Sequence, residues 1–331
     1  METRRPTSTA SGIIRRFGLA RVQLRGRRPL VAPAIAAVGI GALVETGRVT
    51  AHDLEPRIYS ASPVGANFLS AAYAHTMGTV SLNPPSLITN VTAEIDGPGI
   101  GYDRTFDFAG RTARLGLALP YRQIDVSADV RGQRQQFTRS GLGDFVMRFG
   151  LNLIGNPALS PAEFEKREPT TTIGAGVIVV APTGDYDTSR LINTGSNRWS
   201  VKPEIGLEQP WRNWFVNATA GTWIFGDNTK FLGGNVLGQE PLWVLQAQTG
   251  YTFRPSLWLA ANATYYTGGE TSLNGVHRHD TISGVRGGLT LAMPLANGVS
   301  MKFAWSTGSG PRAGANATIL GATLQYRWFD P

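Results

Sequence analysis

Long runs in which apolar and polar side chains alternate dominate this sequence and restrict the folds open to it. In the stretch "RQIDVSADVRGQ", Ile124, Val126 and Ala128 lie on one face of an extended chain, while Asp125 and Asp129 lie on the other. A period of two marks a β-strand that has two different surroundings. The pattern recurs near residues 66–77, 104–119, 121–136, 143–154, 170–181, 198–208, 213–225, 245–253, 257–267, 283–293, 298–306 and 319–328. Because turn-forming residues separate these segments, we expect about twelve strands.

The length of these segments and the places of their aromatic residues distinguish two kinds of all-β protein. A soluble sandwich buries the apolar face of each strand, whereas a membrane barrel turns that face to lipid. Most segments have about 10 residues, which is long for a sandwich but matches a tilted crossing of a bilayer. Aromatic residues near segment ends are typical of interfacial girdles; here they are Trp199, Trp214, Trp243, Tyr251, Phe253, Trp258, Tyr265, Trp305, Tyr326 and Trp328. The sequence predicts a transmembrane antiparallel up-and-down β-barrel of about 12 strands in an outer membrane.

The chain ends in "ILGATLQYRWFDP", in which Leu320, Leu324, Tyr326 and Trp328 share one face. The last strand of a barrel pairs with the first, so this segment is predicted to close the barrel. It is similar to the terminal signal that outer-membrane proteins present to their assembly machinery. It departs from that signal because "DP" follows the aromatic residues.

Residues 1–51 have the order of an export signal. Arginines from Arg15 to Arg28 precede the uncharged apolar stretch "LVAPAIAAVGIGALV", and "VTA" ends at Ala51 with small residues suited to cleavage. The alternative is an anchoring helix, but this stretch falls short of the ~20 residues that a membrane span needs. Nine Arg and two Glu give this leader +7 of the formal net charge of +8, so the basic balance does not indicate nucleic-acid binding. We predict that residues 1–51 are cleaved and that 52–331 form the outer-membrane barrel.

Several stretches carry a more specific resemblance. "YSASPVGANFLSAAYAHTMG", "YDRTFDFAGRTARLGLALPY", "GLGDFVMRFGLNLIGNPALSPAEF", "APTGDYDTSRLINTGSNRWSVKPEIGLEQP" and "YTFRPSLWLAANATYYTGG" occur in this order. Together they resemble the MetA-pathway phenol-degradation family of outer-membrane, transporter-like proteins. The resemblance implies an outer-membrane barrel and uptake of aromatic or phenolic compounds.

The barrel interior is predicted from the polar face of each strand. If Ile124 and Phe149 face lipid, charged residues on the opposite faces line the lumen, because an Arg or Lys in lipid costs ~2 to 4 kcal/mol at the midplane. These candidates for a solute path are Arg114, Asp125, Asp129, Arg131, Asp144, Arg148, Lys202, Glu204, Glu208, Arg286, Lys302 and Arg327. Two interpretations remain open: a polar conduit that orients a small solute, or a lumen packed with salt bridges. Pairing of 121–136 with 143–153 would place Asp125 and Asp129 on the same wall as Asp144 and Arg148.

Two connections between the expected strands carry sequence patterns that predict local structure. "APTGDYDTSRLINTGSNRW" is a long turn-rich loop that either folds over the mouth of the barrel or stays solvated and mobile. "SPAEF" predicts a short helix with Ser160 as N-cap, Pro161 at its first position and Glu163 at its third.

The sequence favours a channel or transporter for small solutes over two alternatives. One alternative is an outer-membrane enzyme that hydrolyses lipids, but His75 is the only histidine in a predicted strand and no serine lies in a GxSxG motif. The other is a structural or adhesive barrel with a plugged lumen. We expect no catalytic residues and no cofactor, and the "HRHD" stretch with His277 and His279 is not predicted to be a metal site. The expected partners are the bilayer and lipopolysaccharide of a Gram-negative-type bacterium, the assembly machinery and the solute, with no nucleic acid.

Overall fold

The protein is a closed antiparallel β-barrel of twelve strands, which confirms the predicted fold class. The computed structural model describes residues 57, 59–80, 88–309 and 315–330. The elements are β1 (Ala66–Val80), β2 (Ile88–Phe108), β3 (Arg111–Val130), β4 (Gln133–Leu142), β5 (Phe145–Ile154), α2 (Pro161–Glu165), β6 (Thr172–Ala181), β7 (Ser200–Trp211), β8 (Trp214–Phe225), β9 (Asn228–Phe231), β10 (Asn235–Gln239), β11 (Leu242–Arg254), β12 (Leu257–Gly268), β13 (Thr271–Leu273), β14 (Val276–His277), β15 (Ile282–Ala296), β16 (Val299–Ser309) and β17 (Ala315–Phe329). Within these residues, no helix has the length and hydropathy to cross a membrane.

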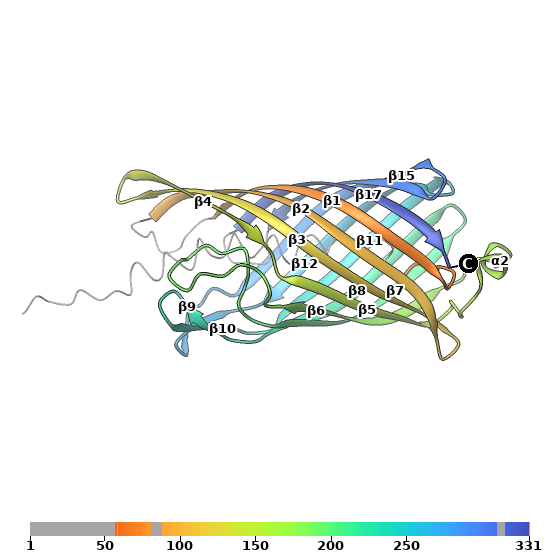
Figure 1. Cartoon of the computed structure of the whole chain (residues 1–331), viewed down its shortest axis with the longest axis horizontal. Coiled ribbons are helices and arrows are strands. Elements are labelled where there is room, and N and C mark those ends of the chain that lie inside the picture. The colour runs from red at the N-terminus through yellow and green to blue at the C-terminus, as the bar shows by residue number, and fades with distance from the viewer. Residues whose placement is uncertain (1–56, 58, 81–87, 310–314, 331) are drawn as a thin grey trace, which may run out of the picture.

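The first and last strands close the barrel. β17 pairs with β1 in an unbroken antiparallel register from Ala66↔Phe329 to Val80↔Ala315, and β1 pairs on its other side with β2. The C-terminal segment is therefore the closing strand, as the sequence predicted. Figure 1 shows the C-terminus and α2 at one end of the barrel and β9 and β10 at the other. We call these the C-terminal end and the loop end.

One position in the barrel wall is shared by two short strands. β3 pairs with β5 over Ala113–Ala118 and with β4 over Tyr121–Val130, so β4 and β5 together form one barrel strand with a break at Gly143 and Asp144. The predicted strand at 104–119 was wrong, because a turn at Ala109 and Gly110, both with positive φ, divides it between β2 and β3. The predicted pairing of 121–136 with 143–153 was also wrong, since 121–130 pairs with β4.

The outer face carries exposed apolar side chains bordered by aromatic residues. Trp211, Trp214, Tyr251, Tyr326 and Trp328 are at least partly exposed near the C-terminal end, and Trp199, Trp243, Tyr265 and Trp305 are exposed toward the loop end. Such rows mark the two interfaces of a bilayer. Trp258 is an exception to the predicted girdle, because it is buried and packs edge-on against Phe215 inside the barrel. The closed wall and the apolar band between the rows fit an outer-membrane location.

The connections differ at the two ends. At the C-terminal end they are short turns, apart from the segment that holds α2, where Ser160 and Glu163 form the predicted capping box. At the loop end, β9, β10, β13 and β14 form a separate small sheet. The loop at 182–199 lies between β6 and β7 and folds inward, as described below.

Candidate functional site: the barrel lumen

Charged side chains from β5 and β7, the two strands on either side of β6, meet inside the barrel. Lys202, Glu204 and Glu208 alternate along β7 on its inner face and are 2%, 6% and 6% exposed. Arg148 of β5 donates to the Glu204 carboxylate, and the Lys202 Nζ lies 3.3 Å from the other Glu204 oxygen. A buried carboxylate is tolerated when cations surround it in this way. The predicted inward positions of these residues agree with the structure.

A segment that precedes the first strand occupies the lumen beside this cluster. We call residues 57 and 59–64 the plug segment. The Tyr59 hydroxyl donates to Glu204 at 3.0 Å, and burial raises the pKa of this hydroxyl, so it remains a donor. Arg57 and Ser60 donate to Glu208 at 3.2 and 3.1 Å, and the Arg57 guanidinium lies 4.7 Å from the centre of the Phe215 ring. The plug segment is thus held by two glutamates of one strand.

Glycines form the socket for the Tyr59 ring. Gly174 of β6 and Gly206 of β7 are partners in the ladder, and a Cβ on either residue would overlap the ring. Gly150 of β5 lies at the edge of the socket, where a Cβ would be 3.8 Å from the ring. The absence of side chains on these inner faces makes room for an aromatic ring against the wall.

The loop at 182–199 closes the lumen from the loop end. The buried Asp144 carboxylate accepts hydrogen bonds from the Gly184 and Ser196 backbone N–H groups at 3.0 and 2.8 Å and from the Ser196 hydroxyl at 2.6 Å. Ile192 of the same loop packs in a buried cluster with Val91, Ile95, Ile124, Val126 and Ala128. The loop therefore folds into the barrel, which was one of the two alternatives from the sequence.

Beside the plug segment, cations and aromatic rings stack along the inner wall, and one of the cations, Arg198, comes from the loop at 182–199. The Lys202 Nζ lies 5.7 Å from the Trp223 ring centre, and the Trp223 and Phe225 rings stack at 6.4 Å with 18° between their planes. The Arg198 guanidinium lies 4.7 Å from the Phe225 ring centre. We call these four residues the cation–aromatic stack. Trp223 belongs to a buried cluster with Tyr266, Leu242 and Val244, so this level of the lumen is aromatic and basic rather than simply polar.

The structure separates the predicted lumen residues into three groups. The first group lies on the inner face and includes Arg148, Lys202, Glu204 and Glu208, described above. Arg114, which pairs with Asp103 at 3.0 Å, and the fully buried Arg286 also belong to it. So do Lys302 and Arg327, because their ladder partners Ala292 and Phe68 face inward. Asp144 is buried at the loop anchor. Asp125, Asp129 and Arg131 are not on the inner face.

The placement of Asp125 and Asp129 was wrong for a physical reason. Ile124 and Val126 are completely buried against the inward-folded loop, so the intervening carboxylates point outward, where Asp125 accepts from Thr138 and Asp129 accepts from Asn90 at 2.7 Å. This part of the wall has water outside and an apolar core inside, which is the reverse of the arrangement in lipid. Arg131 lies exposed with positive φ in the β3–β4 turn.

Sequence reasoning missed Tyr59, Trp223, Phe225 and Arg198. Tyr59 lies outside any periodic segment, so no alternation indicated its position. Trp223 and Phe225 share the inner face of β8 with Phe215 and Asn217, and that shared parity is the signal that could have placed them.

His75, the histidine considered for an enzyme, is on the outer wall. Its Nδ1 lies 2.9 Å from an Asp96 oxygen. The other side chain that binds the Asp96 carboxylate is the Tyr73 hydroxyl and not a serine. The described contacts thus give His75 a carboxylate partner without a nucleophile.

Sequence comparison places this barrel among known families. The profile described as "Putative MetA-pathway of phenol degradation" matches residues 82–328. The chain belongs to this family. No curated protein sequence matches the chain.

Solved structures support the same fold. An outer membrane channel from Pseudomonas putida F1 superposes with a TM-score of 0.71 at 19% identity and covers 83% of this chain and 100% of its own. The β domain of the Bordetella autotransporter BrkA has a TM-score of 0.50 at 13% identity, covering 80% of this chain and 100% of its own. At these identities the similarity concerns the barrel fold alone.

Proposed function

We propose that the protein is an outer-membrane channel for small solutes, with aromatic or phenolic compounds as the preferred class. The observation that carries the proposal is the cation–aromatic stack of Lys202, Trp223, Phe225 and Arg198 inside the lumen. If these side chains only packed the lumen, aliphatic residues would stabilise the barrel more than cations placed over ring faces. An aromatic acid suits this wall, because its ring can stack on Trp223 or Phe225 while its carboxylate pairs with Lys202 or Arg198.

The plug segment and the loop at 182–199 restrict the path from opposite ends. The described contacts of both are non-covalent, and they include hydrogen bonds, apolar packing and the Arg57–Glu208 ion pair, so each can leave the lumen without breaking a covalent bond. Family membership supports this function for the barrel. The proposal includes export by a cleaved leader at residues 1–51, insertion by the outer-membrane assembly machinery and contact with lipopolysaccharide.

Uptake into liposomes tests the solute class. We expect reconstituted protein to admit benzoate faster than cyclohexanecarboxylate, which has the same charge and similar size but no π face. Trp223→Leu should lower this ratio by roughly two- to thirteen-fold, since an aromatic contact contributes about 0.5 to 1.5 kcal/mol. Trp243→Leu is the matched control, because Trp243 is exposed on the outer face and should leave the ratio unchanged.

Each alternative function predicts a different result. A barrel that admits no solute, even when the plug segment has been displaced, is structural. Hydrolysis of phospholipid that disappears in His75→Ala would make the protein an enzyme. An equal loss of benzoate preference in Trp223→Leu and Trp243→Leu would remove the stack from the solute path.

A further inference from the structure

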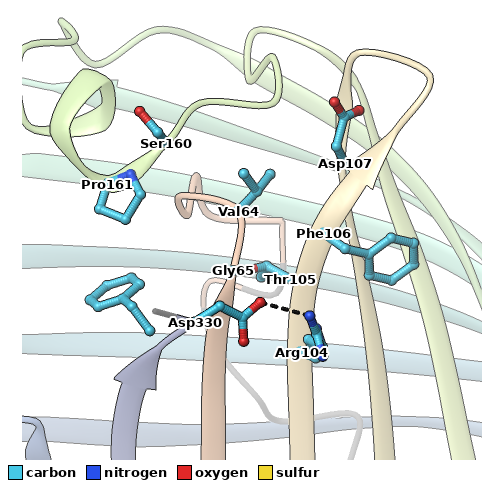
Figure 2. Close-up of a pocket in the computed structure, with 10 residues that line it drawn as sticks. Val64, Gly65, Arg104, Thr105, Phe106, Asp107, Ser160, Pro161 and Asp330 are labelled. Atoms are coloured by element: carbon cyan, nitrogen blue, oxygen red, sulfur yellow. Dashed lines mark hydrogen bonds and ion pairs between the residues drawn. The ribbon is translucent and has the colours of Figure 1, made fainter.

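The end of the chain contacts the place where the plug segment joins the barrel wall. Asp330 follows the last residue of β17 and accepts from Arg104 Nη2 of β2 at 2.6 Å and from Asn67 Nδ2 of β1 at 2.9 Å. Figure 2 shows Asp330 and Arg104 facing each other beside Val64 and Gly65. Asp330, which follows the aromatic residues of the closing strand, thus bonds to two different strands, β1 and β2.

The backbone of Asp330 binds the hinge of the plug segment directly. Its N–H donates to the Gly65 carbonyl at 2.9 Å, and the Gly65 N–H donates to the Thr105 carbonyl at 2.9 Å. Gly65 has a φ of +76°, which lets the chain turn from the lumen into β1. The Thr105 hydroxyl also donates to the Pro63 carbonyl at 2.6 Å. The hinge is therefore fixed between the end of β17 and β2.

We propose that Asp330 is a latch that holds the plug segment in the lumen. Asn67 and Arg104 meet Asp330 only when β17 is paired with β1, so the latch forms when the barrel closes. The carboxylate of Asp330 is 40% exposed and the Arg104 side chain 48% exposed, so water competes for the pair and the latch can open. This arrangement gives Asp330 a role after the closing strand is complete.

The surroundings of the hinge leave room for it to move. A cavity of about 330 Å³ lies beside it, lined by residues that include Val64, Gly65, Arg104, Ser160 and Asp330. Figure 2 shows Ser160 and Pro161 of the α2 region on the far side of this cavity from Arg104. Once the latch opens, displacement of the hinge into this space meets little packed structure.

Thiol labelling measures the position of the plug segment without reference to transport. The chain contains no cysteine, so Ala61→Cys gives a single reporter inside the plug segment. In folded protein, Asp330→Asn and Arg104→Gln should each raise the rate of maleimide labelling at residue 61 by roughly five-fold, as expected for loss of a charge-assisted hydrogen bond. The double variant should label no faster than the faster single variant, because both changes remove one interaction.

Glu165→Gln is the matched control, since it removes an exposed carboxylate of α2 at the same end of the barrel. Labelling rates in Asp330→Asn and Arg104→Gln that equal the control would overturn the latch. So would a lower unfolding midpoint in urea with unchanged labelling, because Asp330 would then only stabilise the seam. If Asp330→Asn does not fold, Arg104→Gln tests the same pair from the wall. The labelling test of the latch does not depend on whether the barrel conducts. Faster labelling in a barrel that never conducts would refute the proposed channel and still support the latch.

Discussion

At the scale of single residues, two glycines, Gly174 and Gly206, determine where the plug segment lies. Gly174 and Gly206 have extended backbone, so they are needed for space and not for an unusual φ. Their inner faces receive the Tyr59 ring, whose hydroxyl then reaches Glu204. The hydrogen bond to Glu204 therefore depends on the socket, because a ring pushed away from the wall would also withdraw the hydroxyl.

A single methyl group in the socket should displace the plug segment. In Gly174→Ala the Cβ would overlap the Tyr59 ring, so we expect the ring to leave and single-channel conductance in planar bilayers to rise several-fold. Gly150→Ala is the control, because its Cβ would be at an ordinary 3.8 Å from the same ring. Equal conductance in the two variants would show that Tyr59 does not obstruct the path.

The sequence located part of this site and not the rest. Arg148, Lys202, Glu204 and Glu208 were predicted to face inward because they alternate with apolar residues on strands that cross the apolar band. Tyr59 was not predicted, since a segment held by a socket on other strands has no periodicity of its own. Long-range contacts such as Tyr59 to Glu204, 145 residues apart, are absent from any local pattern.

At the scale of elements, β3 shows why alternation alone does not tell inside from outside. In its first half, Leu115, Leu117 and Leu119 share the outer face, whereas in its second half Ile124 and Val126 are buried on the inner face. The register with β2 is continuous from Phe108↔Arg111 to Thr92↔Ser127, so no bulge causes the change. The apolar positions move from odd to even numbers because the strand passes from lipid into water. This change of parity is visible in the sequence and marks the edge of the membrane.

Arginine substitutions on the outer face of β3 should separate its two halves. Leu117 shares its face with the exposed Met147, so Leu117→Arg should destabilise the inserted barrel by about 2 to 4 kcal/mol if it lies near the midplane. Asp125→Arg lies on the same side beyond the apolar band and should change stability by less than ~0.5 kcal/mol. Urea unfolding in lipid vesicles, followed by heat-modifiable gel mobility, measures both. A similar loss of stability in the two variants would contradict the proposed edge of the membrane.

At the scale of the whole molecule, the barrel is a wall closed from both ends by its own chain. Among the predicted lumen residues that lie on the inner face, basic side chains outnumber carboxylates. The basic ones are Arg114, Arg148, Lys202, Arg286, Lys302 and Arg327, and the acidic ones are Glu204 and Glu208. Glu208 binds Arg57 and Ser60 of the plug segment, and Asp144 binds the loop, so both carboxylates are partly occupied by the closures. In a confined lumen the field of such charges is concentrated, which favours anions along the path.

The reversal potential under a salt gradient tests this balance, with Gly174→Ala as the background so that the path is open. We expect the open barrel to prefer anions, and Lys202→Gln to shift its reversal potential toward cations, because one inward positive charge beside Glu204 is removed. Asp129→Asn should leave the potential unchanged, although it also removes one charge, because Asp129 lies on the outer wall and bonds to Asn90 and Arg134 there. Equal and opposite shifts in these two variants would place Asp129 on the ion path and contradict the outward facing of β3. No shift in Lys202→Gln would mean that ions pass without meeting the cation–aromatic stack, and the preference for aromatic anions would lose its physical basis.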